Sequence, residues 1–281
     1  MTKKMEINKE HRSPGRILDE LGITSPDEID IEAIAFHCGA MIRYRPLTGC
    51  DARIVGNMNN AIITVNSDSP RARQRFSAAH ELGHWAHDRG RASFSCKEEQ
   101  FVQEWSRHNP ESRANRYASD LLLPTSLFLP KASTFKRMDF DVVSNLAKYF
   151  NTSLTATTIR LVECGPFLTM LVCYSAANRE WFVRNPNVPE QLWPPQKPGL
   201  KTYAFALLKA GKQRDCRGEV PAEAWFEHRC AENYYIYEHS FRTSYGDVLT
   251  LLWWGSEEMI IDVENYEERK ANRRSDNRLE E

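Results

Sequence analysis

The chain has 281 residues, 41% of them hydrophobic, and a formal net charge of −1. This composition supports one large or several small packed domains and excludes the intrinsically disordered class. The balanced charge argues against a general nucleic-acid-binding surface, although a local basic patch remains compatible with it.

The N-terminus and the cysteines predict where the protein resides. Residues 1–16 are polar and charged, without the hydrophobic stretch of a signal peptide. The longest apolar runs, such as residues 248–254, are too short to span a bilayer. Seven cysteines without CxxC spacing favour reduced thiols over a disulfide framework. We therefore expect a cytoplasmic protein with no membrane partner.

The first predicted elements are a short helix and three strands. Residues 30–38 have helical hydrophobic periodicity, which Gly39 ends as a C-cap. Residues 40–44 and 52–55 are strand-like, and residues 61–65 are the most β-prone stretch of the first half. We expect residues 61–65 to form an edge strand to which an extended peptide adds; the alternative is an internal strand.

A longer helix is predicted from Ser69-Pro70 to about His87, since serine and proline favour helix starts. It contains His80-Glu81-Leu82-Gly83-His84, and histidines four residues apart project from one face of a helix. Two such imidazoles can share a zinc ion, with Glu81 positioned to move protons during hydrolysis. The alternative is two solvent-facing histidines on an ordinary helix.

Residues 91–110 are irregular and polar and contain Cys96. From this position a thiolate could reach the open coordination position of the zinc and hold the enzyme inactive as a cysteine switch. A partly buried cysteine packed beside Phe94 and Phe101 explains Cys96 equally well.

A second strong helix is predicted over residues 110–122, ended by Pro124. Glu111 and Asn115 share one of its faces, so Asn115 could support a metal ligand through a hydrogen bond. From the residues alone, several side chains are candidates for the third ligand. They are Asp88, His87, Glu104, Glu111 and Asp120.

The strings at residues 73–84 and 111–124 together resemble those of the ImmA/IrrE metallopeptidases. In that family the glutamate that opens the second string is the third zinc ligand, which implies Glu111 here. Tyr117 replaces the usual phenylalanine and Leu123 the usual methionine. The resemblance covers about residues 25–165 and implies a zincin-like, gluzincin-type peptidase domain that binds Zn²⁺ through His80, His84 and Glu111, with Glu81 as the catalytic residue.

Residues 140–150 and 153–163 predict two amphipathic helices of helix-turn-helix dimensions. Because the second helix offers Arg160 as its one basic residue, we favour a packing or docking role over DNA reading. Further on, strands are predicted at 167–174, 181–183, 234–237 and 248–254, with a helix at 203–210. The charge-dense residues 264–281 are expected to be frayed or disordered.

The predicted fold class is therefore α+β. We expect a zinc metallopeptidase domain over 1–130, a helix-turn-helix-like segment over 131–165, and a C-terminal α/β GAF-like regulatory domain over 166–281. The last resembles a sensor found in some family members. A basic cluster near it indicates single-stranded DNA as one activating signal, and a small molecule as another. The cluster comprises Lys201, Lys209, Lys212, Arg214 and Arg217.

The resemblance implies an endopeptidase that cleaves a helix-turn-helix (XRE-type) repressor encoded next to it, in response to stress. Cleavage would release stress, DNA-damage or anti-phage genes from repression. One alternative is a non-catalytic metal-containing regulator that binds DNA or a protein partner. Another is a hydrolase for a non-peptide amide.

Overall fold

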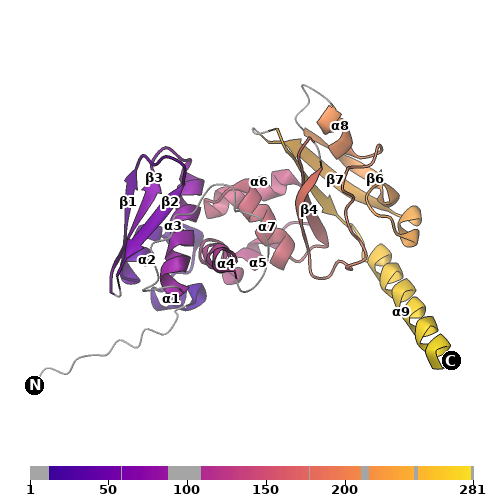
Figure 1. Ribbon diagram of the computed structural model, residues 1–281, viewed down its shortest axis with the longest axis horizontal. Helices are drawn as coiled ribbons and strands as arrows, with labels where there is room; N and C mark the ends of the chain where they lie inside the picture. The colour runs from indigo at the N-terminus through magenta and orange to yellow at the C-terminus, as the bar shows by residue number, and fades with distance from the viewer. Residues whose placement is uncertain are drawn as a thin grey trace, which may run out of the picture. The chain divides into compact units, whose positions relative to one another are not determined.

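The structure, a computed structural model, describes residues 13–57, 59–87, 109–176, 178–209, 215–243 and 246–279. The chain divides into two compact units (Figure 1). Unit 1 comprises Met1–Lys131 and Asn145–Thr157, and unit 2 comprises Ala132–Ser144 and Thr158–Glu281. Among the described helices, none is long and apolar enough to cross a membrane.

Unit 1 contains a three-stranded mixed sheet. Its strands are β1 (Ala40–Arg45), β2 (Ala52–Gly56) and β3 (Ala61–Asn66), in the order β1-β3-β2. β3 pairs in parallel with β1 and antiparallel with β2, so it is the central strand. The expectation that residues 61–65 form a substrate-binding edge is therefore wrong, because both neighbours use the β3 backbone. Among the described strands, β1 and β2 lie at the edges of this sheet.

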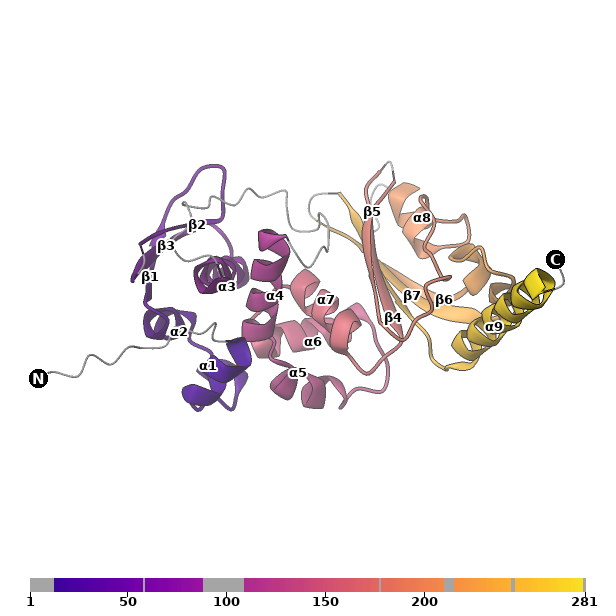
Figure 2. The same cartoon turned by 60° about the horizontal axis from the view of Figure 1, so that its bottom comes forward.

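Five helices complete the main body of unit 1. They are α1 (Pro14–Glu20), α2 (Ile31–His37), α3 (Arg71–His87), α4 (Pro110–Leu122) and α5 (Thr125–Ala132), with a 3₁₀ turn η1 (Pro26–Glu28). Helix α3 packs against β2 and β3, and α4 packs against α3 (Figure 2). The core between these elements is mainly aliphatic, with Trp85 and Tyr117 as its buried aromatic residues. It includes Ile17, Ile31, Ile34, Ile54, Ile63, Val65, Leu82 and Leu121.

The two helices expected at residues 140–163 are present as α6 (Phe140–Phe150) and α7 (Leu154–Cys164). Asn151 between them has a positive φ of 52°, a backbone conformation that asparagine tolerates well. Arg160 is only 7% exposed, so the one basic residue of the second helix is not presented to a DNA groove. The packing role expected for this segment is consistent with that burial.

Unit 2 is built on a five-stranded antiparallel sheet in the order β5-β4-β8-β7-β6. Its strands are β4 (Thr169–Tyr174), β5 (Arg179–Arg184), β6 (Asp215–Pro221), β7 (Tyr235–Arg242) and β8 (Val248–Trp253). Helix α8 (Tyr203–Lys209) and the 3₁₀ turns η3 (Ala222–Ala224) and η4 (Arg229–Asn233) lie between strands in the sequence. The chain is thus α+β, as predicted, with its larger sheet antiparallel.

The last described element is helix α9 (Glu258–Leu279), so the expectation of a frayed tail is wrong over residues 264–279. Met259, Ile260 and Val263 are buried in the core of unit 2. The Tyr234 hydroxyl donates to Asp262 Oδ2 at 2.6 Å. Glutamate, lysine and arginine are good helix formers. The charged residues of this segment therefore continue α9 beyond its buried first turns.

Candidate metal centre

The metal-binding motif lies in the buried part of α3. Ser77 to Trp85 are all buried, so the motif does not face solvent as an ordinary exposed pair of histidines would. His80 is 8% exposed, His84 1% and Glu81 0%. A buried carboxylate and two buried imidazoles on one helix require compensating partners, because burial of isolated polar groups is unfavourable.

Helix α4 places its ligand in the first helical turn. Asn109 is the N-cap, and its side chain accepts a hydrogen bond from the Glu111 backbone N–H at 3.0 Å. Pro110 occupies the first helical position, where a missing N–H costs no hydrogen bond. The cap orients the first turn, and the positive end of the helix dipole favours the negative charge of Glu111.

Gly83 lets α3 and α4 approach closely enough for their side chains to meet. A Cβ atom at Gly83 would lie 2.9 Å from Ala114 Cα and 3.0 Å from Tyr117 Cβ. No real side chain fits at those distances, so glycine between the two histidines is a requirement of this helix crossing. Ala114, one turn after Glu111, is the matching small residue on α4.

The ligand atoms of His80, His84 and Glu111 face one another across this crossing. His80 Nε2 lies 3.1 Å from His84 Nε2 and 3.1 Å from Glu111 Oε2. His84 Nε2 lies 3.4 Å from Glu111 Oε1. One ligand atom from each of the three residues lies within 4.8 Å of the others, and this is the candidate metal group found in the part of the chain that the structure describes.

Asn115 fixes the orientation of the first histidine. His80 Nδ1 lies 2.8 Å from Asn115 Oδ1. Since an amide oxygen only accepts, this contact places the ring proton of His80 on Nδ1. The Nε2 lone pair of His80 then points at His84 and Glu111. A cation or a proton between His80 and these two side chains would compensate for the facing lone pairs.

The electrostatics of the group keep its carboxylate ionised. The polar contacts of Glu111 with His80 and then with His84 lower the pKa of this carboxyl well below its usual range, and they outweigh the opposing effect of burial. An ionised carboxylate with two nitrogen donors is a ligand set that binds first-row divalent metals.

The remaining predicted site residues separate into three groups. Glu81 follows His80 and is fully buried, but it is not one of the three clustered ligands. His87 and Asp120, the other described candidates for third ligand, are also outside the cluster. The His87 ring instead lies 5.8 Å from that of Tyr117. Asp88, Cys96 and Glu104 lie outside the described residues, so the cysteine switch stays a prediction.

Comparison with known proteins agrees with the resemblance seen in the two strings. Residues 35–162, somewhat less than half of the chain, match the family model of the IrrE N-terminal-like domain (Peptidase_M78). A solved structure described as a Mycobacterium tuberculosis transcriptional regulator is similar with a TM-score of 0.56 at 13% identity. That similarity covers 88% of this chain and 77% of the other, and it shows a shared fold. No match is found among curated proteins.

Proposed function

We propose that this chain, which carries an IrrE N-terminal-like domain at residues 35–162, is a zinc-dependent endopeptidase. The observation that supports this most is the convergence of His80, His84 and Glu111 from two crossing helices. His80 and His84 are buried and Glu111 is partly buried, and a bound cation would compensate for placing these three polar groups together. In this proposal the domain is zincin-like and of the gluzincin type.

The spacing of the imidazole nitrogens and of the two Glu111 carboxylate oxygens is compatible with zinc. Tetrahedral coordination with bonds of about 2.0–2.1 Å separates ligand atoms by about 3.3–3.4 Å. The contacts between the three residues are 3.1, 3.1 and 3.4 Å. A bound zinc ion supplies a Lewis acid that polarises a peptide carbonyl and acidifies a water molecule. Three protein ligands leave a fourth position for that chemistry.

Each side chain has a distinct role in this proposal. His80, His84 and Glu111 bind the metal, and Asn115 orients His80. Glu81 takes a proton from the attacking water and donates it to the leaving amine. Glu81 is completely buried beside His80 in α3.

The proposed substrate is a helix-turn-helix (XRE-type) repressor, and unit 2 is the proposed GAF-like sensor. Support for the substrate comes from the domain family; support for the sensor is the separate antiparallel sheet of unit 2. A substrate strand would pair with β1 or β2, the edge strands of the described sheet of unit 1. A small-molecule activator fits unit 2 better than single-stranded DNA, because Lys201 and Arg217 of the basic cluster are paired with Glu223 and Asp141.

The test is cleavage of candidate repressors by the zinc-loaded protein, with and without DNA, starting from any repressor encoded beside it. Glu81→Gln should retain zinc but lower the cleavage rate by about 10²–10⁴-fold, since it removes proton transfer. If the repressor is bound but not cut, and Glu81→Gln binds it equally well, the chain is instead a non-catalytic regulator.

A further inference from the structure

Within the described residues, helices α2 and α3 pack against one face of the sheet of unit 1, its inner face (Figure 1). Side chains of this face, among them Ile54, Ile63 and Val65, belong to the buried core. Successive side chains of a strand point to opposite faces, so the intervening residues define an outer face. The outer face includes Met41, Arg43, Arg45, Arg53, Val55, Ile62 and Thr64.

An apolar row crosses the outer face from one edge strand to the other. Strand pairing places Met41 of β1 beside Ile62 of β3, and Ile62 beside Val55 of β2. Met41 and Val55 are each 59% exposed, and Ile62 is 39% exposed. Single exposed apolar side chains are common on protein surfaces, whereas adjacent ones form the kind of patch that other molecules bind.

A basic row lies beside the apolar row. Two residues further along the strands, Arg43 of β1 and Arg53 of β2 flank Thr64 of β3. Arg43 Nε donates to Thr64 Oγ1 at 2.8 Å, so this exposed arginine lies over a threonine that is only 2% exposed. Arg45, also exposed, follows on β1. Because strand residues rise about 3.3 Å each, the two rows are about 6.6 Å apart.

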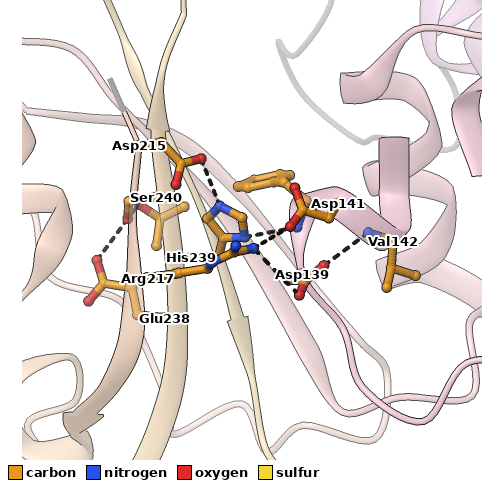
Figure 3. Close-up of polar contacts among 10 residues, drawn as sticks. Asp139, Asp141, Val142, Asp215, Arg217, Glu238, His239 and Ser240 are labelled. Carbon is orange, nitrogen blue, oxygen red and sulfur yellow. Dashed lines mark hydrogen bonds and ion pairs between the residues drawn. The ribbon is translucent and has the colours of Figure 1, made fainter. Parts of the chain in front are cut away.

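No carboxylate among the described residues forms an ion pair with the three arginines of the outer face. The acid that precedes β2, Asp51, instead accepts from Arg73 Nε at 2.7 Å. An arginine on the sheet of unit 2 shows the contrast, because Arg217 is ion-paired with both Asp139 and Asp141 (Figure 3). The outer face therefore presents a local positive charge in a chain whose formal net charge is −1.

The two rows together match a helix that has apolar residues on one side and acids beside them. Adjacent strands lie about 4.8 Å apart, so the apolar row spans about 9.6 Å from β1 to β2. Two turns of an α-helix rise about 10.8 Å. A helix that crosses the strands can therefore cover the row with apolar residues at i, i+4 and i+7, while acids on its flank reach the arginines.

Two other occupants fit the outer face less well. A second copy of this face would place the arginines of one chain against those of the other, and like charges across an interface oppose association. Single-stranded nucleic acids are held by aromatic side chains on which the bases stack, whereas the apolar row of this face is aliphatic.

We propose that the outer face of the unit 1 sheet is a docking surface for an acidic amphipathic helix of a partner protein. The surface is separate from the metal centre, because α3 carries the two histidines and packs against the inner face. Docking through outer-face side chains also leaves the backbone edges of β1 and β2 unused. The proposal does not depend on peptidase activity, since this binding requires neither a metal ion nor cleavage.

The experiment measures binding of two synthetic helical peptides to the full chain by fluorescence anisotropy. The acidic peptide has leucines at i, i+4 and i+7 flanked by glutamates, and the control peptide has lysines in place of the glutamates. The acidic peptide should bind about tenfold more tightly than the control, and added salt should weaken its binding. Equal binding of the two peptides, or no binding of the acidic one, would overturn the proposal.

Variants test whether the acidic peptide binds to this face. Arg53→Glu should weaken binding about tenfold, because it sets an acid against the acids of the peptide. Arg116→Glu makes the same charge reversal at an exposed position of α4 and should leave binding unchanged. Val55→Thr should weaken binding severalfold, since a hydroxyl replaces a methyl group of similar size. Equal effects of the two charge reversals would show a response to net charge alone and would contradict the assigned surface.

Met41 reports directly on what covers the outer face. In the free chain, hydrogen peroxide should oxidise Met41 faster than the buried Met138 and Met170, and the acidic peptide should slow the oxidation of Met41. Protection of Met41 in the free monomer would show that the chain covers this face itself. Protection only in a dimer, or by single-stranded DNA but not by the acidic peptide, would assign the face to a second copy or to nucleic acid. Each of these three results would overturn the proposal.

Discussion

Asn115 shows how one side chain on α4 determines the chemistry of a ligand on α3. Its oxygen selects the His80 tautomer whose Nε2 carries the lone pair that a metal ion binds. His80 and His84 were predictable as a pair because a four-residue spacing alone places them on one helical face. The role of Glu111 could not be predicted in this way, because no local periodicity relates this residue to α3. Its assignment depended on the resemblance, and the structure brings it to the two histidines.

We predict that Asn115→Ala lowers zinc affinity about 10–100-fold, because it releases the orientation and tautomer of His80. Chelator competition on the purified protein measures this change. Arg116→Ala is the control, since Arg116 is the exposed next residue on the same helix. Equal affinities of Asn115→Ala and the wild type would show that His80 needs no such support.

At the scale of elements, the crossing of α3 and α4 depends on Gly83. We predict that Gly83→Ala destabilises the protein by about 1–3 kcal/mol, because the new methyl group forces the helices apart. Zinc affinity should fall as well, since the two histidines separate from Glu111. Thermal unfolding with and without zinc measures both effects.

Gly15→Ala is the matched control in helix α1. A Cβ atom at Gly15 meets no atom within 4 Å. Replacing glycine by alanine in an open helical position stabilises it by about 0.5–1 kcal/mol. If Gly83→Ala behaves like Gly15→Ala, the close approach of α3 and α4 is not what positions the ligands.

Element boundaries were predictable where hydrophobic period and capping residues agree, as in α3, α4 and β8. Two errors have physical causes. Residues 61–65 were assigned to an edge although Ile63, Thr64 and Val65 are consecutively buried, the mark of a central strand covered on both faces. Strand β6 was missed because its sequence is polar, which suits its position at the edge of the sheet.

At the scale of the whole molecule, pH should affect stability through Glu238 of unit 2. This fully buried carboxylate accepts hydrogen bonds from the Ala204 N–H, Ser240 Oγ and Trp225 Nε1. Burial nevertheless raises the pKa of Glu238 above its ordinary 4.5. A raised pKa in the folded state contributes stability that is complete below 4.5 and is lost as pH rises through the folded value.

We therefore predict that the unfolding free energy of the wild type declines more steeply with rising pH above 4.5 than that of Glu238→Gln. Denaturant titrations followed by tryptophan fluorescence measure this, since Trp225 contacts Glu238 directly. Glu219→Gln, at an exposed position on β6, should retain the wild-type slope. If the unfolding free energy of Glu238→Gln changes with pH as steeply as that of the wild type, other titrating groups cause the pH dependence.

The function proposed for the whole chain depends on one metal ion bound between α3 and α4. Zinc stoichiometry, measured after dialysis of the purified protein against a slight excess of the ion, tests this most directly. We predict one zinc ion per chain in the wild type and in Glu81→Gln, and none in His84→Ala or Glu111→Ala, because two remaining ligands bind zinc weakly. Full occupancy in His84→Ala or Glu111→Ala, or an empty wild-type protein, would contradict the account.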